Sequence, residues 1–197
     1  SITKGSESVI YGYDGKLITS ETLSGTLNQS LAYTYNNDFN VDDFTYAGGT
    51  ISYGYDNDGL LTGAGSFTIT RNAGNGLPES VTGGALNLGR TFNGYGEMDS
   101  QTISVSGQSV ASWSLIHDDN GRITDKTETV AGTTSGYVYA YDDAGRLQTV
   151  TKDGELVEEY QYDLNGTRFY EMNSLRGIAG RSYSYSDEDH LLSAGPV

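Results

Sequence analysis

The chain has 197 residues, of which 26 are acidic and 11 basic, so its net charge is −15 and its pI is near 4.2. Phosphate backbones and anionic lipid surfaces repel such a charge, so we expect no nucleic-acid partner and no membrane-surface role. No Cys is present and no apolar run approaches the ~18 residues of a membrane helix, which excludes disulfides and thiolate metal sites and predicts no membrane insertion.

A short motif recurs along the chain, with its sharpest copy at Tyr137–Leu147 (Tyr-Val-Tyr-Ala-Tyr-Asp-Asp-Ala-Gly-Arg-Leu). Nine copies align on the residue that precedes the turn, here called the anchor, and the anchors are 22, 20, 16, 21, 25, 24, 21 and 23 residues apart. A unit of this length cannot bury its own apolar face, so neighbouring units must stack.

The motif residues fall in chain order. The first four copies contain Tyr13 and Asp14 in a shortened turn; Tyr35; Tyr53, Tyr55, Asp56 and Gly59; and a blurred version around Arg71 with one inserted residue. The last five contain Phe92 and Gly96; His117, Asp118 and Gly121; Tyr139, Tyr141, Asp142, Gly145, Arg146 and Leu147; Tyr160, Tyr162, Asp163 and Gly166; and Tyr183 and Tyr185. We assign all of them a structural role in the repeat.

Each copy predicts a β-hairpin. Before the turn, Tyr137, Tyr139 and Tyr141 alternate with smaller residues, and side chains two apart in a strand share one face. Asp142 and Gly145 then suit the first and fourth positions of a type I turn, where the carboxylate accepts backbone N–H bonds and Gly takes the positive φ of a following bulge. A second strand begins at Leu147 and ends at a second Gly-rich turn, Asp153-Gly154.

The fold class follows from these hairpins. Strands joined by short loops pair antiparallel, so the chain reads as an all-β meander of roughly eighteen strands. Because strand twist accumulates across a wide sheet, we expect a curved or spiralling strip, an open fragment of a β-shell. We expect residues 1–197 to form a single array of about nine repeats, without a separate catalytic or plug domain. Tyr stripes of successive hairpins should stack into aromatic ladders.

Candidate chemistry is sparse. His117 and His190 are the only histidines, and a metal-ligand or general-base role for His117 competes with a simpler one, in which its ring replaces Tyr in the ladder. The tetrads starting at Asp56 and Asp118 resemble calcium ligands, but a calcium site needs six or more oxygens, and turn capping explains these carboxylates. No nucleophile elbow is present. We therefore expect no enzyme activity and no cofactor.

The phrase Tyr-x-Tyr-Asp-x-x-Gly-Arg-Leu at Tyr139–Leu147 resembles the YD repeat of the Rhs family, which includes bacterial polymorphic toxins, the C subunits of insecticidal toxin complexes, and teneurins. The resemblance implies a β-strip that spirals into a hollow shell, which encloses a C-terminal toxin in bacterial members and forms an extracellular scaffold in teneurins. It also implies a secreted or cell-surface location. The sequence ends at Pro196 and Val197 without the family's plug motif, so no residue inherits its autoproteolytic role.

Two functions remain open. The leading one is a non-enzymatic structural segment of a larger Rhs-like protein, whose partner is the remainder of the parent polypeptide, including further repeats and an enclosed C-terminal toxin. The alternative is an adhesin-like module that binds carbohydrate or protein through exposed Tyr and acidic turns, although the Tyr stripe is more simply read as core. Edge strands could also associate end to end.

Overall fold

The computed structural model describes residues 1–196 and contains nineteen β-strands and one short 3-10 turn, η1 (Ser174–Arg176). The contacts divide the chain into two compact units, residues 1–89 and 90–197. Every described ladder is antiparallel and joins two strands that are consecutive in the chain. The predicted all-β antiparallel meander is therefore confirmed, with nineteen strands where the repeat count indicated roughly eighteen.

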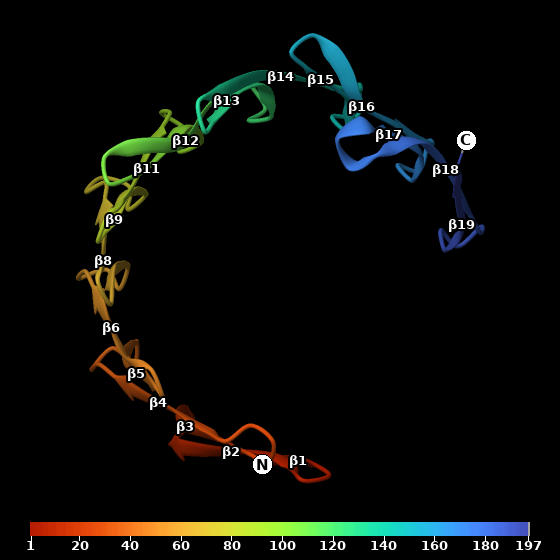
Figure 1. Ribbon diagram of the computed structural model, residues 1–197. Helices are drawn as coiled ribbons and strands as arrows, with labels where there is room; N and C mark the ends of the chain where they lie inside the picture. The colour runs from red at the N-terminus through yellow and green to blue at the C-terminus, as the bar shows by residue number, and fades with distance from the viewer. Residues whose placement is uncertain (197) are drawn as a thin grey trace. The chain divides into compact units, whose positions relative to one another are not determined.

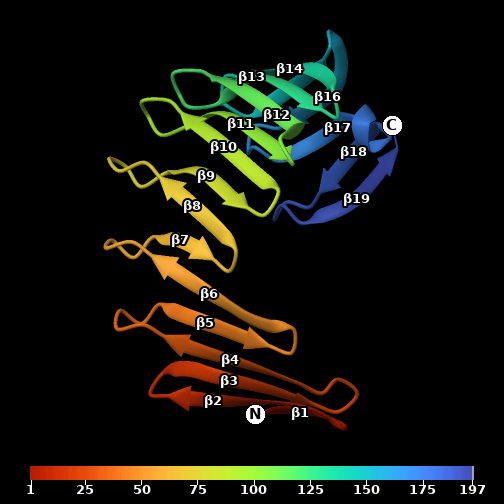
Figure 2. The same ribbon diagram turned by 60° about the vertical axis from the view of Figure 1, so that its left-hand side comes forward.

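The first unit is a meander whose strands lie side by side (Figure 2). Its strands are β1 (Ile2–Lys4), β2 (Glu7–Asp14), β3 (Leu17–Ser24), β4 (Gln29–Tyr35), β5 (Val41–Tyr46), β6 (Gly49–Tyr55), β7 (Leu61–Ala64), β8 (Phe67–Arg71) and β9 (Pro78–Gly83). Strand β10 (Leu86–Phe92) pairs with β9 through Leu86–Gly89 and ends in the second unit.

The second unit continues the same hairpins, and its strands follow an arc (Figure 1). They are β11 (Met98–Val105), β12 (Gln108–His117), β13 (Ile123–Val130), β14 (Thr133–Tyr141), β15 (Leu147–Lys152), β16 (Glu155–Tyr162), β17 (Arg168–Asn173), β18 (Ile178–Tyr185) and β19 (Leu191–Pro196).

The two faces of each ladder differ in side-chain size. On β14, Tyr137, Tyr139 and Tyr141 are half-buried, whereas Val138 and Ala140 between them are exposed. The small-residue face carries hydroxyl pairs that bridge neighbouring strands, such as Thr129 Oγ1 to Thr134 Oγ1 at 2.8 Å. Bulky residues thus share one face, here called the tyrosine face, and small polar residues share the other.

The tyrosine face does not form an enclosed core. Only two hydrophobic side chains among the described residues are buried, Val150 and Val157, at 2% and 7% exposure. The Tyr side chains of this face are at most half-buried, because each unit consists of one sheet and no second layer of strands or helices lies over it within residues 1–196. The expectation that the Tyr stripe makes a core therefore holds only in part.

The aromatic ladder is present in the first unit only. Ring pairs there include Tyr33 with Phe44, 5.2 Å between centroids, and Phe44 with Tyr46, 5.9 Å. Among the described residues of the second unit no aromatic pair forms, and cations lie over the Tyr rings instead. The ladder prediction is wrong for that unit because Lys and Arg side chains on the same face occupy the space between successive rings.

Candidate functional site

The repeat's turns carry most of the motif residues, so they are the candidate site. In the sharpest copy, Gly145 N–H donates to Asp142 O at 2.8 Å and Asp142 N–H donates to Arg146 O at 2.9 Å. Asp142 Oδ1 accepts from the N–H groups of Ala144 and Arg146. Gly145 has a φ of 79°, and the register between β14 and β15 shifts at Ala140 and Tyr141, which pair with Thr149 and Leu147. This is a type I turn followed by a bulge.

Other copies build the same turn with different side chains. The capping oxygen belongs to Asp or Asn in most of them: Asn36, Asp56, Asn93, Asp118 and Asp163. Gly59, Gly96, Gly121 and Gly166 take a positive φ at the position of Gly145. Phe39 and Asp189 occupy that position elsewhere with φ of 63° and 60°, which shows that the turn imposes the conformation even on residues that resist it.

The first turn departs from the pattern. Asp14 pairs with Leu17 across a two-residue loop, and Gly15 takes a φ of 60°. Asp14 lies inside β2 and is exposed, and no hydrogen bond of its carboxylate occurs among the described residues. Asp14 therefore does not cap its turn as Asp142 does, because the shortened loop presents no N–H groups to the carboxylate.

Five of the six anchor tyrosines, all except Tyr13, bind the hairpin before their own. Tyr141 Oη donates to Ile123 O at 2.7 Å, and Ile123 is the first residue of the return strand of the preceding repeat. Four other anchors make the matching bond, Tyr35 to Ile18, Tyr55 to Val41, Tyr162 to Leu147 and Tyr185 to Arg168, at 2.7–2.9 Å. In the irregular copy around Arg71 a guanidinium makes the matching bond, since Arg71 Nε donates to Leu61 O at 2.9 Å.

The residue after the turn glycine reaches the next repeat. Arg146 Nε lies 2.7 Å from Asp142 Oδ2 in its own turn, and its guanidinium lies 4.6 Å from the centroid of the Tyr162 ring in the following turn. Arg146 Nη1 also donates to Asp163 O at 3.1 Å. Arg122 has the same position between Asp118 and Tyr141. Each arginine therefore joins a carboxylate of one repeat to an aromatic ring of the next.

The electrostatics of these turns follow from the contacts. The guanidinium of Arg122 hydrogen-bonds the carboxylate of Asp118 and lowers its pKa, with smaller contributions from backbone N–H donors. For Asp142 the backbone N–H of Arg146 is the leading cause of a lowered pKa, followed by that residue's side chain. Burial raises the pKa of the Tyr141 hydroxyl, which keeps it protonated as a donor over the usual pH range.

The tyrosines two positions before the anchors lie on the tyrosine face. Tyr160 Oη donates to Glu158 Oε2 at 2.7 Å, and Tyr183 Oη donates to Glu171 Oε1 at 2.6 Å. Tyr53 and Tyr139 occupy the matching places and are half-buried. Glu171 is 3% exposed and its other oxygen lies 3.1 Å from Arg168 Nη2. These bonds satisfy polar atoms on a face that is otherwise aromatic.

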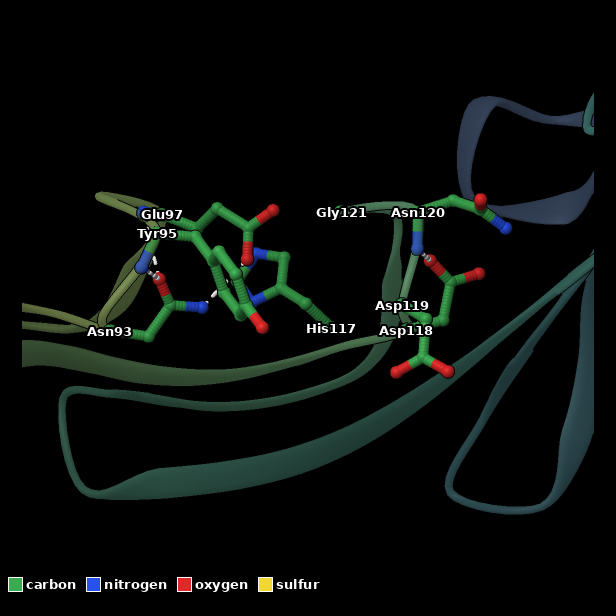
Figure 3. Close-up of a pocket in the computed structure, with 8 residues that line it drawn as sticks. All are labelled: Asn93, Tyr95, Glu97, His117, Asp118, Asp119, Asn120 and Gly121. Carbon is green, nitrogen blue, oxygen red and sulfur yellow. Dashed lines mark hydrogen bonds between the residues drawn. The ribbon is translucent and has the colours of Figure 1, made fainter.

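Besides Arg71, two anchors lack a hydroxyl, Phe92 and His117. His117 lies in the anchor position of its repeat, and no hydrogen bond or ion pair of its ring occurs among residues 1–196. It borders a cavity of about 520 Å³ between the turns 93–97 and 117–121, together with Tyr95, Glu97 and Asp119 (Figure 3). Within the described part of the chain no group of three or more His, Cys, Asp or Glu residues is placed to hold a metal ion.

Two of these contacts, the anchor hydroxyl bond and the arginine contact, were not predicted from the sequence. The target of the anchor hydroxyl is a backbone carbonyl, which no side-chain identity marks. The arginine contact had a signal, since Arg122 and Arg146 follow the turn glycine at the same position in adjacent copies. The described residues also hold no helix of the length and hydrophobicity that crossing a bilayer requires.

The fold and the turns together define a class of protein: an array of β-hairpins with a Tyr-Asp turn, joined from repeat to repeat by hydroxyl and guanidinium contacts. The family model described as "Teneurin YD-shell" matches residues 3–196. The chain therefore belongs to the teneurin YD-shell family, whose members are structural segments of a β-shell.

Relatives and solved structures agree with this assignment. Teneurin-4 of Homo sapiens is 29% identical over 154 residues, and teneurin-3 of Mus musculus is 27% identical over 186 residues. These matches cover 74% and 88% of this chain but only 5% and 6% of the two teneurins. The chain thus spans a small part of the length of these relatives.

Among solved structures, the crystal structure of TcdB2-TccC3 without its hypervariable C-terminal region has a TM-score of 0.72 and 13% identity, and the match covers 94% of this chain and 11% of that one. The Tc holotoxin pore of Photorhabdus luminescens has a TM-score of 0.60 and 10% identity over 94% of this chain and 13% of that one. At these identities the likeness concerns the fold alone.

Proposed function

We propose that the segment is a non-enzymatic part of a shell wall in a longer protein, where it encloses or displays another segment of the same polypeptide. The repeat array would be a single wall of about nine hairpins, and the motif residues would shape its turns and link neighbouring hairpins. The observation that carries the proposal is the bond that recurs from five anchor hydroxyls to the preceding hairpin. These bonds would keep successive hairpins in register along the wall.

Family membership and the fold likeness to Tc toxin structures support this role. In the bacterial relatives that the sequence resembles, the enclosed segment would be a C-terminal toxin, and the protein would be secreted or at the cell surface. The partner of this segment would then be the remainder of its own polypeptide. No catalytic arrangement is needed for such a role.

Limited proteolysis of the longer protein tests the proposal. An enclosed segment should resist a protease that cleaves it readily when it is expressed alone, and Arg146→Ala should shorten that protection because it loosens two adjacent turns. Equal cleavage of the segment in both contexts would contradict enclosure.

A second function is favoured by one observation. Tyr33, Phe44 and Tyr46 form a stacked row on the tyrosine face, and Tyr46 is 38% exposed. Aromatic rings of this kind can bind sugars or peptides, as an adhesin-like module would require. A glycan array separates the two functions, because a passive wall should show no saturable ligand, whereas an adhesin should bind one that Tyr46→Ala weakens.

A further inference from the structure

Two successive repeats hold a guanidinium group in the same way. Arg122 lies 2.7 Å from Asp118 Oδ2 and 4.6 Å from the Tyr141 ring, and Arg146 lies 2.7 Å from Asp142 Oδ2 and 4.6 Å from the Tyr162 ring. Each guanidinium also borders the next turn's glycine, since a Cβ at Gly145 would lie 3.1 Å from Arg122 Nη1. The place between two consecutive turns is therefore built for a planar cation.

The corresponding place between the turns 93–97 and 117–121 holds no cation. The residue at the arginine position is Glu97, and its carboxylate reaches Gly121 as Arg122 reaches Gly145. Glu97 Oε2 accepts from Asn93 Nδ2 at 2.6 Å. A glutamate is shorter than an arginine and the next anchor, His117, is smaller than tyrosine, so a cavity of about 520 Å³ remains (Figure 3).

The lining of this cavity suits a cation. Within residues 1–196, Glu97 Oε1 and the carboxylate of Asp119 have no hydrogen-bond partner, and Asp119 is exposed. The rings of His117 and Tyr95 border the same space, and Tyr95 is 92% exposed. Asp118, in contrast, is already paired with Arg122. The cavity thus offers the free oxygen of Glu97 beside two aromatic rings, and the free carboxylate of Asp119 on the opposite turn, where the next two repeats hold their own guanidinium.

We propose that this cavity binds the guanidinium group of an arginine side chain supplied from outside residues 1–197, by another segment of the polypeptide or by a partner protein. Carboxylates bind a guanidinium through two parallel hydrogen bonds, and aromatic rings stack on its face. A lysine ammonium lacks the planar fork, so arginine is preferred over lysine. The proposal is independent of whether the wall encloses a cargo.

Titration of the full chain with N-acetyl-arginine amide tests the proposal by amide chemical shifts. Saturable shifts should appear at Tyr95 and Gly121 and should be absent at Gly145, whose neighbouring site is filled by Arg122. The citrulline analogue, which has the same shape without the charge, should bind at least tenfold more weakly. No saturable shift, or equal binding of citrulline or lysine amide, would overturn the proposal.

Two variants locate the site. Glu97→Arg places a guanidinium in the cavity from within, so it should abolish ligand binding, whereas Glu155→Arg, an equal charge change at an exposed residue distant in sequence, should leave it intact. Glu97→Gln removes the charge with little change in size and should weaken binding at least tenfold, which keeps the test usable if Glu97→Arg fails to fold. Unchanged affinity in folded Glu97→Gln and Glu97→Arg would refute the assignment of this cavity.

Discussion

Gly145 meets two separate demands at the residue scale. Its φ of 79° lies in the left-handed region that β-branched residues avoid, and the space where a Cβ would stand is bordered by Arg122 of the preceding repeat at 3.1 Å. Phe39 shows that the first demand alone can be met by a larger residue. The second applies only where an arginine of the preceding turn borders the glycine, at Gly145 and Gly166.

Gly145→Val should therefore destabilise the protein by about 1–3 kcal/mol, through backbone strain and displacement of Arg122. The matched control is Gly94→Val, at a turn glycine that does not have a positive φ and whose added Cβ would meet nothing within 4 Å. Urea unfolding measures both. A Gly145→Val protein that unfolds at the parent's urea concentration would mean that the turn is assigned wrongly.

The hydroxyl of an anchor tyrosine can be tested alone. Tyr141→Phe keeps the ring and removes the 2.7 Å bond to Ile123 O, so it should cost about 1 kcal/mol, the net value of a typical hydrogen bond. Tyr95→Phe removes the hydroxyl of a 92% exposed side chain and should cost nothing measurable. Equal melting temperatures for the two variants would show that the hydroxyl bond does not stabilise the array.

At the element scale, two kinds of contact link a hairpin to the next one along the chain. The arginine after one turn contacts the ring and the backbone of the following turn, while the anchor hydroxyl of that turn binds back to the preceding strand. Both contacts join the same two hairpins, and each hairpin supplies the side chain of one of them. Their loss should therefore affect the following turn as well as the turn that carries the substitution.

Arg146→Ala should destabilise the protein, and a double-mutant cycle with Tyr162→Leu should give a coupling energy of about 0.5–1 kcal/mol for the cation over the ring. Arg176→Ala is the control, because Arg176 lies in the exposed η1 turn and its side chain contacts no aromatic ring among the described residues. Additive effects of Arg146→Ala and Tyr162→Leu would show that the stacking is not energetically coupled.

The turn carboxylates predict an acid dependence. Because the pKa values of Asp118 and Asp142 are lowered in the folded state, their stabilisation is complete above the unfolded value of about 3.9 and is lost as the pH falls through the lower folded values. Unfolding by urea at pH 6 and pH 2.5 measures this loss. The double variant Asp118→Asn, Asp142→Asn, which keeps the capping oxygens, should show a smaller loss than the parent; an equal loss would refute the assignment.

The sequence predicted local structure better than contacts between repeats. Asp142 and Gly145 encode their turn through spacing within four residues, so the hairpins were predictable. The ladder of rings was not, because the side chain facing each Tyr depends on which strands pair and on bulges such as that between Ala140 and Tyr141. The shallow burial of Tyr139 likewise depends on the absence of a covering layer, which no residue of the motif signals.

At the scale of the whole molecule, the two faces of the hairpins in each unit differ in chemistry. One face presents small hydroxyl residues, and the other presents half-buried tyrosines, with cationic side chains such as Lys126 and Arg146 over their rings. The turns carry capping carboxylates such as that of Asp142. In the proposed shell, the two faces would meet different environments. The net charge of −15 keeps the exposed strands soluble and opposes unwanted pairing of their edges.

Electron cryo-microscopy of the longer protein that contains these residues tests the shell assignment most directly. We expect residues 1–197 to form consecutive hairpins of a shell wall, with density for another part of the polypeptide against one face only. A map in which the hairpins are consecutive but both faces meet solvent would contradict enclosure. A map in which residues 1–197 do not form part of a continuous wall would contradict the shell role itself.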